Sequence, residues 1–331
     1  MSIDWEKKIK IDTAWIDRQL INHFVDKNLK VAIRGYTPKS SGTTFSCDAL
    51  IEELGFMLPE YVHSEKSKQK KLKALTSKFG EKTAQQRLDN ALYKEAQEFF
   101  GKKDPTTDGK YGELLLFALT ESVLKSKMVA HKIVSLSNTR DQVKGGDGVF
   151  LGNYEIEEGK FEPAILIGES KIMQGLSTCI DESYDSLNRF YSTETRAEFN
   201  SMEFIVANNT MFLDESDTDY EKVYDLLTPG TDAFKRQIVV HPILIMYNTS
   251  KINTIEQKAK NNDELEQLIK EFMEKEKTDF ITKISEKLLA FPNIKKVYVD
   301  FFLFPFNEID NFRNGMYFNI HKVPFSKDNT L

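Results

Sequence analysis

Cysteine is scarce in this sequence. Only Cys47 and Cys179 occur among its 331 residues. Two thiols are too few for a disulfide framework or a zinc site built from thiolates, and such scarcity is typical of proteins in a reducing compartment. We therefore expect a cytoplasmic protein that folds without disulfide bonds.

Long hydrophobic runs are also missing. No stretch approaches the roughly 20 apolar residues of a membrane span, and residues 1–8 contain no apolar segment of the kind that directs secretion. With 40% hydrophobic and 29% charged residues, the composition fits a globular protein. We expect no association with a membrane.

Sequence motifs of several enzyme classes are absent. The chain has no Gly-x-x-x-x-Gly-Lys-Ser/Thr loop for nucleotide phosphates, no His-Glu-x-x-His pair for zinc and no Gly-x-Ser-x-Gly turn for a serine nucleophile. The five histidines are dispersed along the chain. These absences argue against an ATPase, a zinc hydrolase of that type and a serine hydrolase, so any input of ATP energy would belong to a partner.

The chain lacks an excess of basic residues, with a formal net charge of −6 and an isoelectric point near 5.6. Because neutralisation of phosphates dominates nonspecific DNA affinity, such a chain needs a local basic patch or a partner to hold nucleic acid. Residues 66–82 are dense in lysine, which is typical of a solvated helical face and also suits a phosphate or partner contact. The predicted helical region 255–291 is a second candidate partner surface.

The sequence does contain an apolar run, residues 164–168, that ends in a carboxylate and an ammonium. Such a run predicts a buried strand, on which Glu169 and Lys171 project from the same face. Charges on a buried face require neutralisation, which a divalent cation would provide. The pair alone is weak support, because 51 acidic and 45 basic residues in 331 yield roughly seven acid-x-base triplets by chance.

Two further acids precede this strand. Glu113 begins a segment that is apolar nearly all round, which predicts a buried helix. Asp147 lies between glycines and opens a short apolar strand. The order along the chain is therefore a helix acid, a strand acid and then Glu-x-Lys at the end of the next strand.

The remaining pattern predicts an α/β fold with a mixed sheet. We expect residues 1–104 to form an N-terminal α/β elaboration and residues 105–331 to form the main domain with an added C-terminal helix and strand. The predicted helices are 15–24, 48–54, 65–100, 113–119, 173–191 and 255–291. The predicted strands are 29–36, 128–136, 149–151, 164–168, 202–207, 241–247 and 296–306, and a polar tail follows.

Together, Gly112-Glu113-Leu114-Leu115, Gly145-Gly146-Asp147-Gly148 and Ile167-Gly168-Glu169-Ser170-Lys171 resemble the PD-(D/E)XK nuclease superfamily. The wider match is similar to the HamA family, the nuclease subunits of the Hachiman anti-phage defence system. It covers roughly residues 105–250. The resemblance implies a restriction-endonuclease-like core with a mixed central sheet flanked by helices, DNA as substrate and a superfamily 2 helicase, HamB, as partner.

One position departs from the superfamily pattern. Gly146 stands where the superfamily name has proline, so Asp147 is assigned by its spacing and context. Asp141 is the alternative strand acid if the register of the hairpin differs.

The resemblance also implies roles for the site residues. Asp147 and Glu169 would bind Mg²⁺, for which Mn²⁺ is an expected substitute, with the Ser170 carbonyl as a third ligand. Glu113 would be a further ligand or act through a metal-bound water. Lys171 would orient the attacking water or stabilise the transition state, and Gln174 would contact the substrate or a ligand.

Three functions remain open at this point. The first is a magnesium-dependent DNA endonuclease that its helicase partner restrains until foreign or damaged DNA is sensed. The second is a non-catalytic docking subunit with a nuclease-like fold, and the third is an RNA-directed nuclease. The four charged residues Glu113, Asp147, Glu169 and Lys171 favour an enzyme, because a degenerate core has no need of all four.

Overall fold

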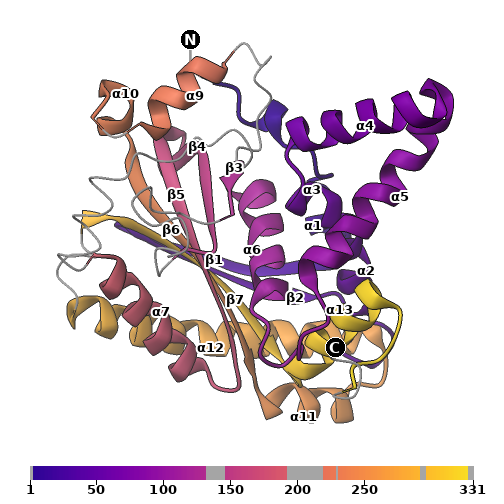
Figure 1. Cartoon of the computed structure of the whole chain (residues 1–331). Helices are drawn as coiled ribbons and strands as arrows, with labels where there is room; N and C mark the ends of the chain where they lie inside the picture. The colour runs from indigo at the N-terminus through magenta and orange to yellow at the C-terminus, as the bar shows by residue number, and fades with distance from the viewer. Residues whose placement is uncertain (1–2, 132–145, 192–218, 229, 291–295, 327–331) are drawn as a thin grey trace.

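The computed structural model of the chain describes residues 3–131, 146–191, 219–228, 230–290 and 296–326 (Figure 1). Its strands belong to a single seven-stranded sheet. They are β1 (Leu20–Asn28), β2 (Val31–Pro38), β3 (Lys127–Ala130), β4 (Gly148–Glu157), β5 (Lys160–Met173), β6 (Ile238–Asn248) and β7 (Tyr298–Phe306).

The sheet is mixed, in the order β1-β2-β7-β6-β5-β4-β3. Strands β2, β7, β6 and β5 pair in parallel, whereas the β1–β2, β5–β4 and β4–β3 pairs are antiparallel. The parallel strands at the centre are almost continuously apolar, as is typical of strands that are covered on both faces. The predicted mixed α/β sheet with flanking helices is confirmed.

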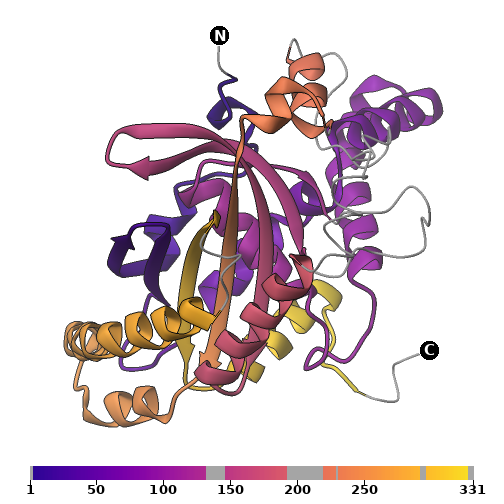
Figure 2. The same ribbon diagram turned by 90° about the vertical axis from the view of Figure 1, so that its left-hand side faces the viewer.

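Helices cover both faces of this sheet (Figure 2). They are α1 (Trp15–Gln19), α2 (Asp48–Phe56), α3 (Leu58–Val62), α4 (Glu65–Phe79), α5 (Glu81–Phe100), α6 (Lys110–Val123), α7 (Leu176–Phe190), α9 (Tyr220–Leu227), α10 (Asp232–Lys235), α11 (Ser250–Lys258), α12 (Asn262–Ala290) and α13 (Ile309–His321), with a short 3-10 helix at Glu6–Lys8. In the described part of the chain, none of them is long and apolar enough to cross a membrane.

The two helical layers follow from the alternation of side chains along β5. Ile167 joins a cluster that includes Phe190 of α7, whereas a side chain at Gly168 would meet Leu116 of α6. Because neighbouring residues of a strand point to opposite faces, α6 and α7 lie on opposite sides of the sheet. Helix α12 continues the α7 layer over β1 and β2, and α13 packs on α2 and β6.

Two predicted elements were wrong. Residues 15–24 were expected to form one helix, but α1 ends at Gln19 and β1 begins at Leu20 because residues 20–28 pair with β2. The expected polar tail after residue 306 instead contains α13. Its apolar residues recur at helical spacing and are fully buried against the core: Ile309, Phe312, Met316, Tyr317 and Ile320. The predicted strand 202–207 lies outside the described residues.

The N-terminal strands are part of the same sheet as the rest of the chain. Arg34 on β2 makes a bidentate ion pair with Asp300 on β7, at 2.8 and 3.0 Å, and Tyr154 on β4 donates its hydroxyl to the same carboxylate at 3.1 Å. Asp300 is fully buried. This cluster links residues 1–104 to the main part of the chain across the predicted boundary, which itself stays a prediction.

Candidate functional site

The end of β5 carries the Glu-x-Lys pair. Glu169 and Lys171 point to the α7 side of the sheet, following Ile165 and Ile167 on the same face. Lys171 Nζ lies 2.6 Å from Glu169 Oε1, and Glu169 is only 7% exposed. The predicted pair is therefore a largely buried ion pair at the end of a central strand.

The charge on Glu169 is disfavoured by its surroundings. Burial raises its pKa above the ordinary value, and the negative charge of Asp147 raises the pKa further. Lys171 and a hydrogen bond from Ser186 on α7 partly offset these effects. Two carboxylates thus act on one another at this strand end, an arrangement that a cation would stabilise.

Asp147 is held by β5. Its backbone N–H donates to the Gly168 carbonyl at 2.8 Å, which places it just before β4. The backbone N–H and the hydroxyl of Ser170 both donate to Asp147 Oδ2, each at 2.8 Å. Ser170 was predicted to act through its carbonyl, and the structure shows that its N–H and hydroxyl orient the Asp147 carboxylate. Asp141, the alternative acid, lies outside the described residues.

Glu113 approaches from the opposite face of the sheet, on the first turn of α6. Gly112 allows this approach, since a Cβ there would lie 3.0 Å from Ile172 Cδ1 and 3.1 Å from Ser170 Oγ. Glu113 is 8% exposed. Glu113 therefore follows Gly112, which packs against Ser170. Helix α6, however, lies on the face of the sheet opposite to the one on which Glu169 and Lys171 project.

Tyr61 on α3 contacts Glu113, and sequence reasoning missed it. Its hydroxyl donates to Glu113 Oε2 at 3.1 Å. The ring is fully buried among aromatic side chains, and burial, with Glu113 nearby, raises the Tyr61 pKa well above its ordinary value. The hydroxyl therefore stays protonated and can donate. The rings around it belong to Phe99, Phe100, Phe117 and His131.

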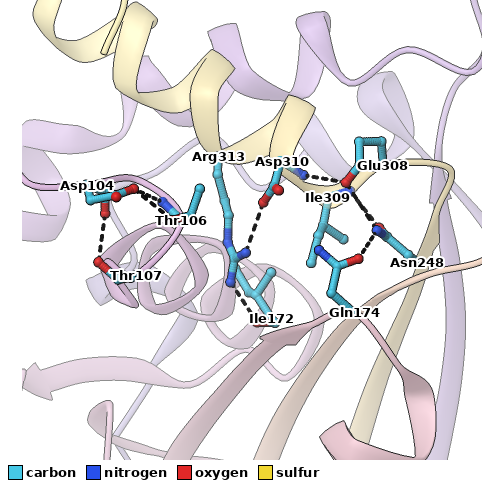
Figure 3. A network of polar contacts seen from close by, with 10 residues as sticks. All are labelled: Asp104, Thr106, Thr107, Ile172, Gln174, Asn248, Glu308, Ile309, Asp310 and Arg313. Atoms are coloured by element: carbon cyan, nitrogen blue, oxygen red, sulfur yellow. Dashed lines mark hydrogen bonds and ion pairs between the residues drawn. The ribbon is translucent and has the colours of Figure 1, made fainter. Parts of the chain in front are cut away.

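Gln174 lies in the bend between β5 and α7, where it is exposed. Its Oε1 accepts a hydrogen bond from Asn248 Nδ2 at 2.5 Å, and Asn248 also contacts Glu308 and the backbone of Ile309 at the start of α13 (Figure 3). In the same network, Arg313 donates to the Ile172 carbonyl at 2.7 Å. Gln174 thus belongs to a polar network that joins the ends of β5 and β6 to α13, and its contact with substrate stays a prediction.

A comparison with protein families gives one match, and it spans nearly the whole chain. The profile of the HamA family matches residues 10–320. The chain belongs to the HamA family. HamA proteins are part of the Hachiman anti-phage defence system. A comparison with curated protein sequences gave no match. The HamA match includes the N-terminal hundred residues, where the sequence alone offered no motif, and therefore includes Tyr61.

The donors of this HamA protein fit a magnesium ion by their chemistry. Among the described residues, no group of three or more His, Cys, Asp or Glu side chains is arranged to hold a metal. Lys171 contacts Glu169 on one face of the sheet. Asp147 connects the two faces: it binds Ser170, and its charge acts both on Glu169 and on Tyr61, the partner of Glu113. Mg²⁺ commonly retains several waters and binds one or two carboxylates together with substrate phosphate. Two interacting carboxylates therefore match what Mg²⁺ requires.

Proposed function

We propose that this HamA protein is a magnesium-dependent DNA endonuclease with a PD-(D/E)XK core. The observation that carries the proposal is the proximity of Asp147, Glu169 and Lys171 at the end of β5, where the charge of Asp147 raises the pKa of Glu169. A structural ion pair alone would not require a second acid at the same place. Membership of the Hachiman system supports a role in defence against phage.

Asp147 and Glu169 would hold the metal in this proposal. Bound Mg²⁺ would polarise the phosphoryl group and lower the pKa of its water. Ser170 keeps the Asp147 carboxylate fixed through two hydrogen bonds to Oδ2. Lys171 contributes a positive charge at the same strand end, where it can orient a nucleophilic water or stabilise charge on the phosphoryl oxygens.

Glu113 and Gln174 would act at the margins of this centre. Glu113, held by Tyr61, is placed to accept a hydrogen bond from a water that enters from the α6 side. Gln174 lies three residues beyond Lys171, next to the N-terminus of α7, a position that suits contact with a phosphate. We further propose that a superfamily 2 helicase, HamB, restrains or licenses the nuclease.

Plasmid cleavage with Mg²⁺ tests the proposal. Glu169→Gln keeps the size of the side chain and removes its charge, and Glu162→Gln makes the same change at a half-buried position of the same strand. We expect the wild type and Glu162→Gln to cut, and Glu169→Gln to lose at least 100-fold in rate. Parallel reactions with helicase and ATP report whether the partner restrains or licenses cleavage.

The opposite result would favour the non-catalytic alternative. If neither the wild type nor Glu169→Gln cuts DNA or RNA with Mg²⁺ or Mn²⁺, while both bind the helicase equally, the protein is a docking subunit. Cleavage of RNA with no cleavage of DNA would keep the metal chemistry and reassign the substrate.

A further inference from the structure

Helices α4 and α5, residues 65–100, form an arm that projects from the body of the protein (Figures 1 and 2). The two helices pack mainly against each other, and α5 also packs on α3. Gly80, with a φ of 76°, separates them at the tip. Within Glu65–Phe79, all of which the structure describes, no residue is buried. Helix α4 therefore contributes little to the core.

The outer helix is strongly basic in an acidic protein. It contains six lysines and a single acid, Glu65, although the chain as a whole carries a net charge of −6. Lys66, Lys70 and Lys73 follow the spacing i, i+4, i+7 and so lie on one face of the helix. We call these three residues the lysine stripe. Lys70 and Lys73 are exposed and Lys66 is half-buried.

Two of the other three lysines of α4 form ion pairs. Lys68 binds Glu60 on α3, and Lys71 binds Glu95 on α5. These ion pairs hold the arm together and attach it to α3. In the described residues no ion pair involves Lys70 or Lys73. Ion pairing within the arm therefore does not explain the positive charges of Lys70 and Lys73.

The root of the arm lies beside the candidate site. Phe99 and Phe100 at the end of α5 contact Tyr61, whose hydroxyl binds Glu113, and Phe100 also stacks on Tyr111 of α6. Lys71 pairs with Glu95, which is about 7.5 Å along the helix from Phe100 at 1.5 Å per residue. The lysine stripe is on α4, which packs against this part of α5. It therefore lies closer to the root of the arm than to its tip.

We propose that the lysine stripe binds the sugar-phosphate backbone of the nucleic acid beside the candidate site. This proposal rests on the proposed function, which supplies the phosphodiester substrate. From Lys66 to Lys73 the helix rises about 10 Å, and over that length one strand of a duplex presents about three phosphates. The arm supplies the local basic patch that an acidic nuclease requires, and its position one element away from Glu113 favours a substrate contact over an acidic protein partner.

The salt dependence of DNA binding tests the stripe. We would measure binding of the full chain to a fluorescent duplex without divalent metal, from 20 to 150 mM salt, for the wild type and for Lys66→Ala/Lys70→Ala/Lys73→Ala. The control, Lys258→Ala/Lys270→Ala/Lys275→Ala, removes the same charge from exposed positions of α11 and α12. Alanine preserves helix propensity at both sites, and melting curves verify that each variant is folded.

We expect the slope of log K against log salt to become shallower by about 2–3 in the stripe variant and to be unchanged in the control. Equal changes in both variants would reveal a net-charge effect and overturn the proposal. So would an unchanged slope, or a stripe variant that binds DNA normally but loses association with the helicase. Because binding is read without cleavage, failure of the stripe is distinguishable from failure of the nuclease assignment.

Discussion

A single hydroxyl, that of Tyr61, connects the N-terminal helices to Glu113. Tyr61→Phe keeps the buried ring and removes the hydrogen bond. We expect a loss of about 1–2 kcal/mol in the free energy of unfolding. We also expect a roughly tenfold slower cleavage and a higher Mg²⁺ concentration at half-maximal rate, because Glu113 loses its orientation. Titration of the cleavage rate with Mg²⁺ measures this shift.

Tyr93→Phe is the matched control, because Tyr93 is a partly buried tyrosine of α5 outside the site. It should leave the Mg²⁺ dependence unchanged. If Tyr61→Phe also leaves that dependence unchanged, Tyr61 stabilises the fold without positioning Glu113.

His241 on β6 predicts a pH dependence of stability. Burial lowers its pKa from 6.5 to about 4. Its ring lies 2.6 Å from the Tyr191 hydroxyl and 3.1 Å from the Ile167 carbonyl. The unfolded chain therefore binds a proton more readily than the folded chain, and this contribution to stability is complete above about pH 6.5 and declines as the pH falls towards 4.

Urea unfolding of the wild type and His241→Gln between pH 7.5 and 4.5 measures this contribution. Over that range the free energy of unfolding of the wild type should fall by about 2 kcal/mol more than that of the variant. The comparison between variants is needed because the raised pKa of Glu169 acts in the opposite direction. If the free energy of unfolding of the two proteins depends on pH in the same way, His241 does not cause the pH dependence.

At the scale of elements, the packing of α6 on β5 depends on Gly112. Gly112→Leu would displace Ser170 and Ile172, because even a Cβ lies within 3.1 Å of Ser170 Oγ. Leucine has the better helix propensity by about 1 kcal/mol, so the helix itself is not weakened. We expect cleavage to fall more than tenfold through the lost orientation of Asp147, with a change of only a few degrees in Tm.

Ser170→Ala serves as the comparison for Gly112→Leu. It removes the hydroxyl contact with Asp147 and keeps the backbone N–H contact. It should therefore reduce cleavage less than Gly112→Leu does. Full activity in both variants would show that the Asp147 carboxylate needs no support from Ser170.

Elements with strong local patterns were predictable from sequence, and contacts between distant elements were not. The apolar run 164–168 correctly indicated a central strand, and the apolar periodicity around Glu113 indicated α6. Residues 20–24 resembled a continuation of α1, because the pairing with β2 that makes them a strand is tertiary. Tyr61 could not be found from sequence, because its link to Glu113 spans 52 residues and leaves no local pattern.

For the molecule as a whole, the Arg34–Asp300–Tyr154 cluster predicts cooperative unfolding. Asp300→Asn leaves the buried Arg34 charge without its counterion, which should lower the free energy of unfolding by about 3–5 kcal/mol. Trp5 and Trp15, both in residues 1–104, are the only tryptophans of the sequence. Trp15 donates to Ser122 and Trp5 packs in a cluster with Val149, so their fluorescence reports the packing of the N-terminal part on the rest of the chain. Circular dichroism reports the helices of the whole chain.

We expect tryptophan fluorescence and circular dichroism to change at the same denaturant concentration. That concentration should be lower for Asp300→Asn than for the wild type. The double variant Arg34→Met/Asp300→Leu should recover most of the loss, since it removes both charges. A tryptophan transition that precedes the change in circular dichroism would instead support residues 1–104 as a separate domain.

The place of β7 in the sheet has a consequence for synthesis on the ribosome. β7 lies between β2 and β6 and pairs in parallel with both, although it is the last of the described strands to be made, at residues 298–306. Until it emerges, the β1–β2 hairpin has no strand partner in the rest of the sheet. At 5–20 residues per second, the nascent chain would spend tens of seconds in that divided state. A premature stop before Tyr298 would therefore release a chain whose sheet cannot be completed, and such fragments would lack the activity that we propose.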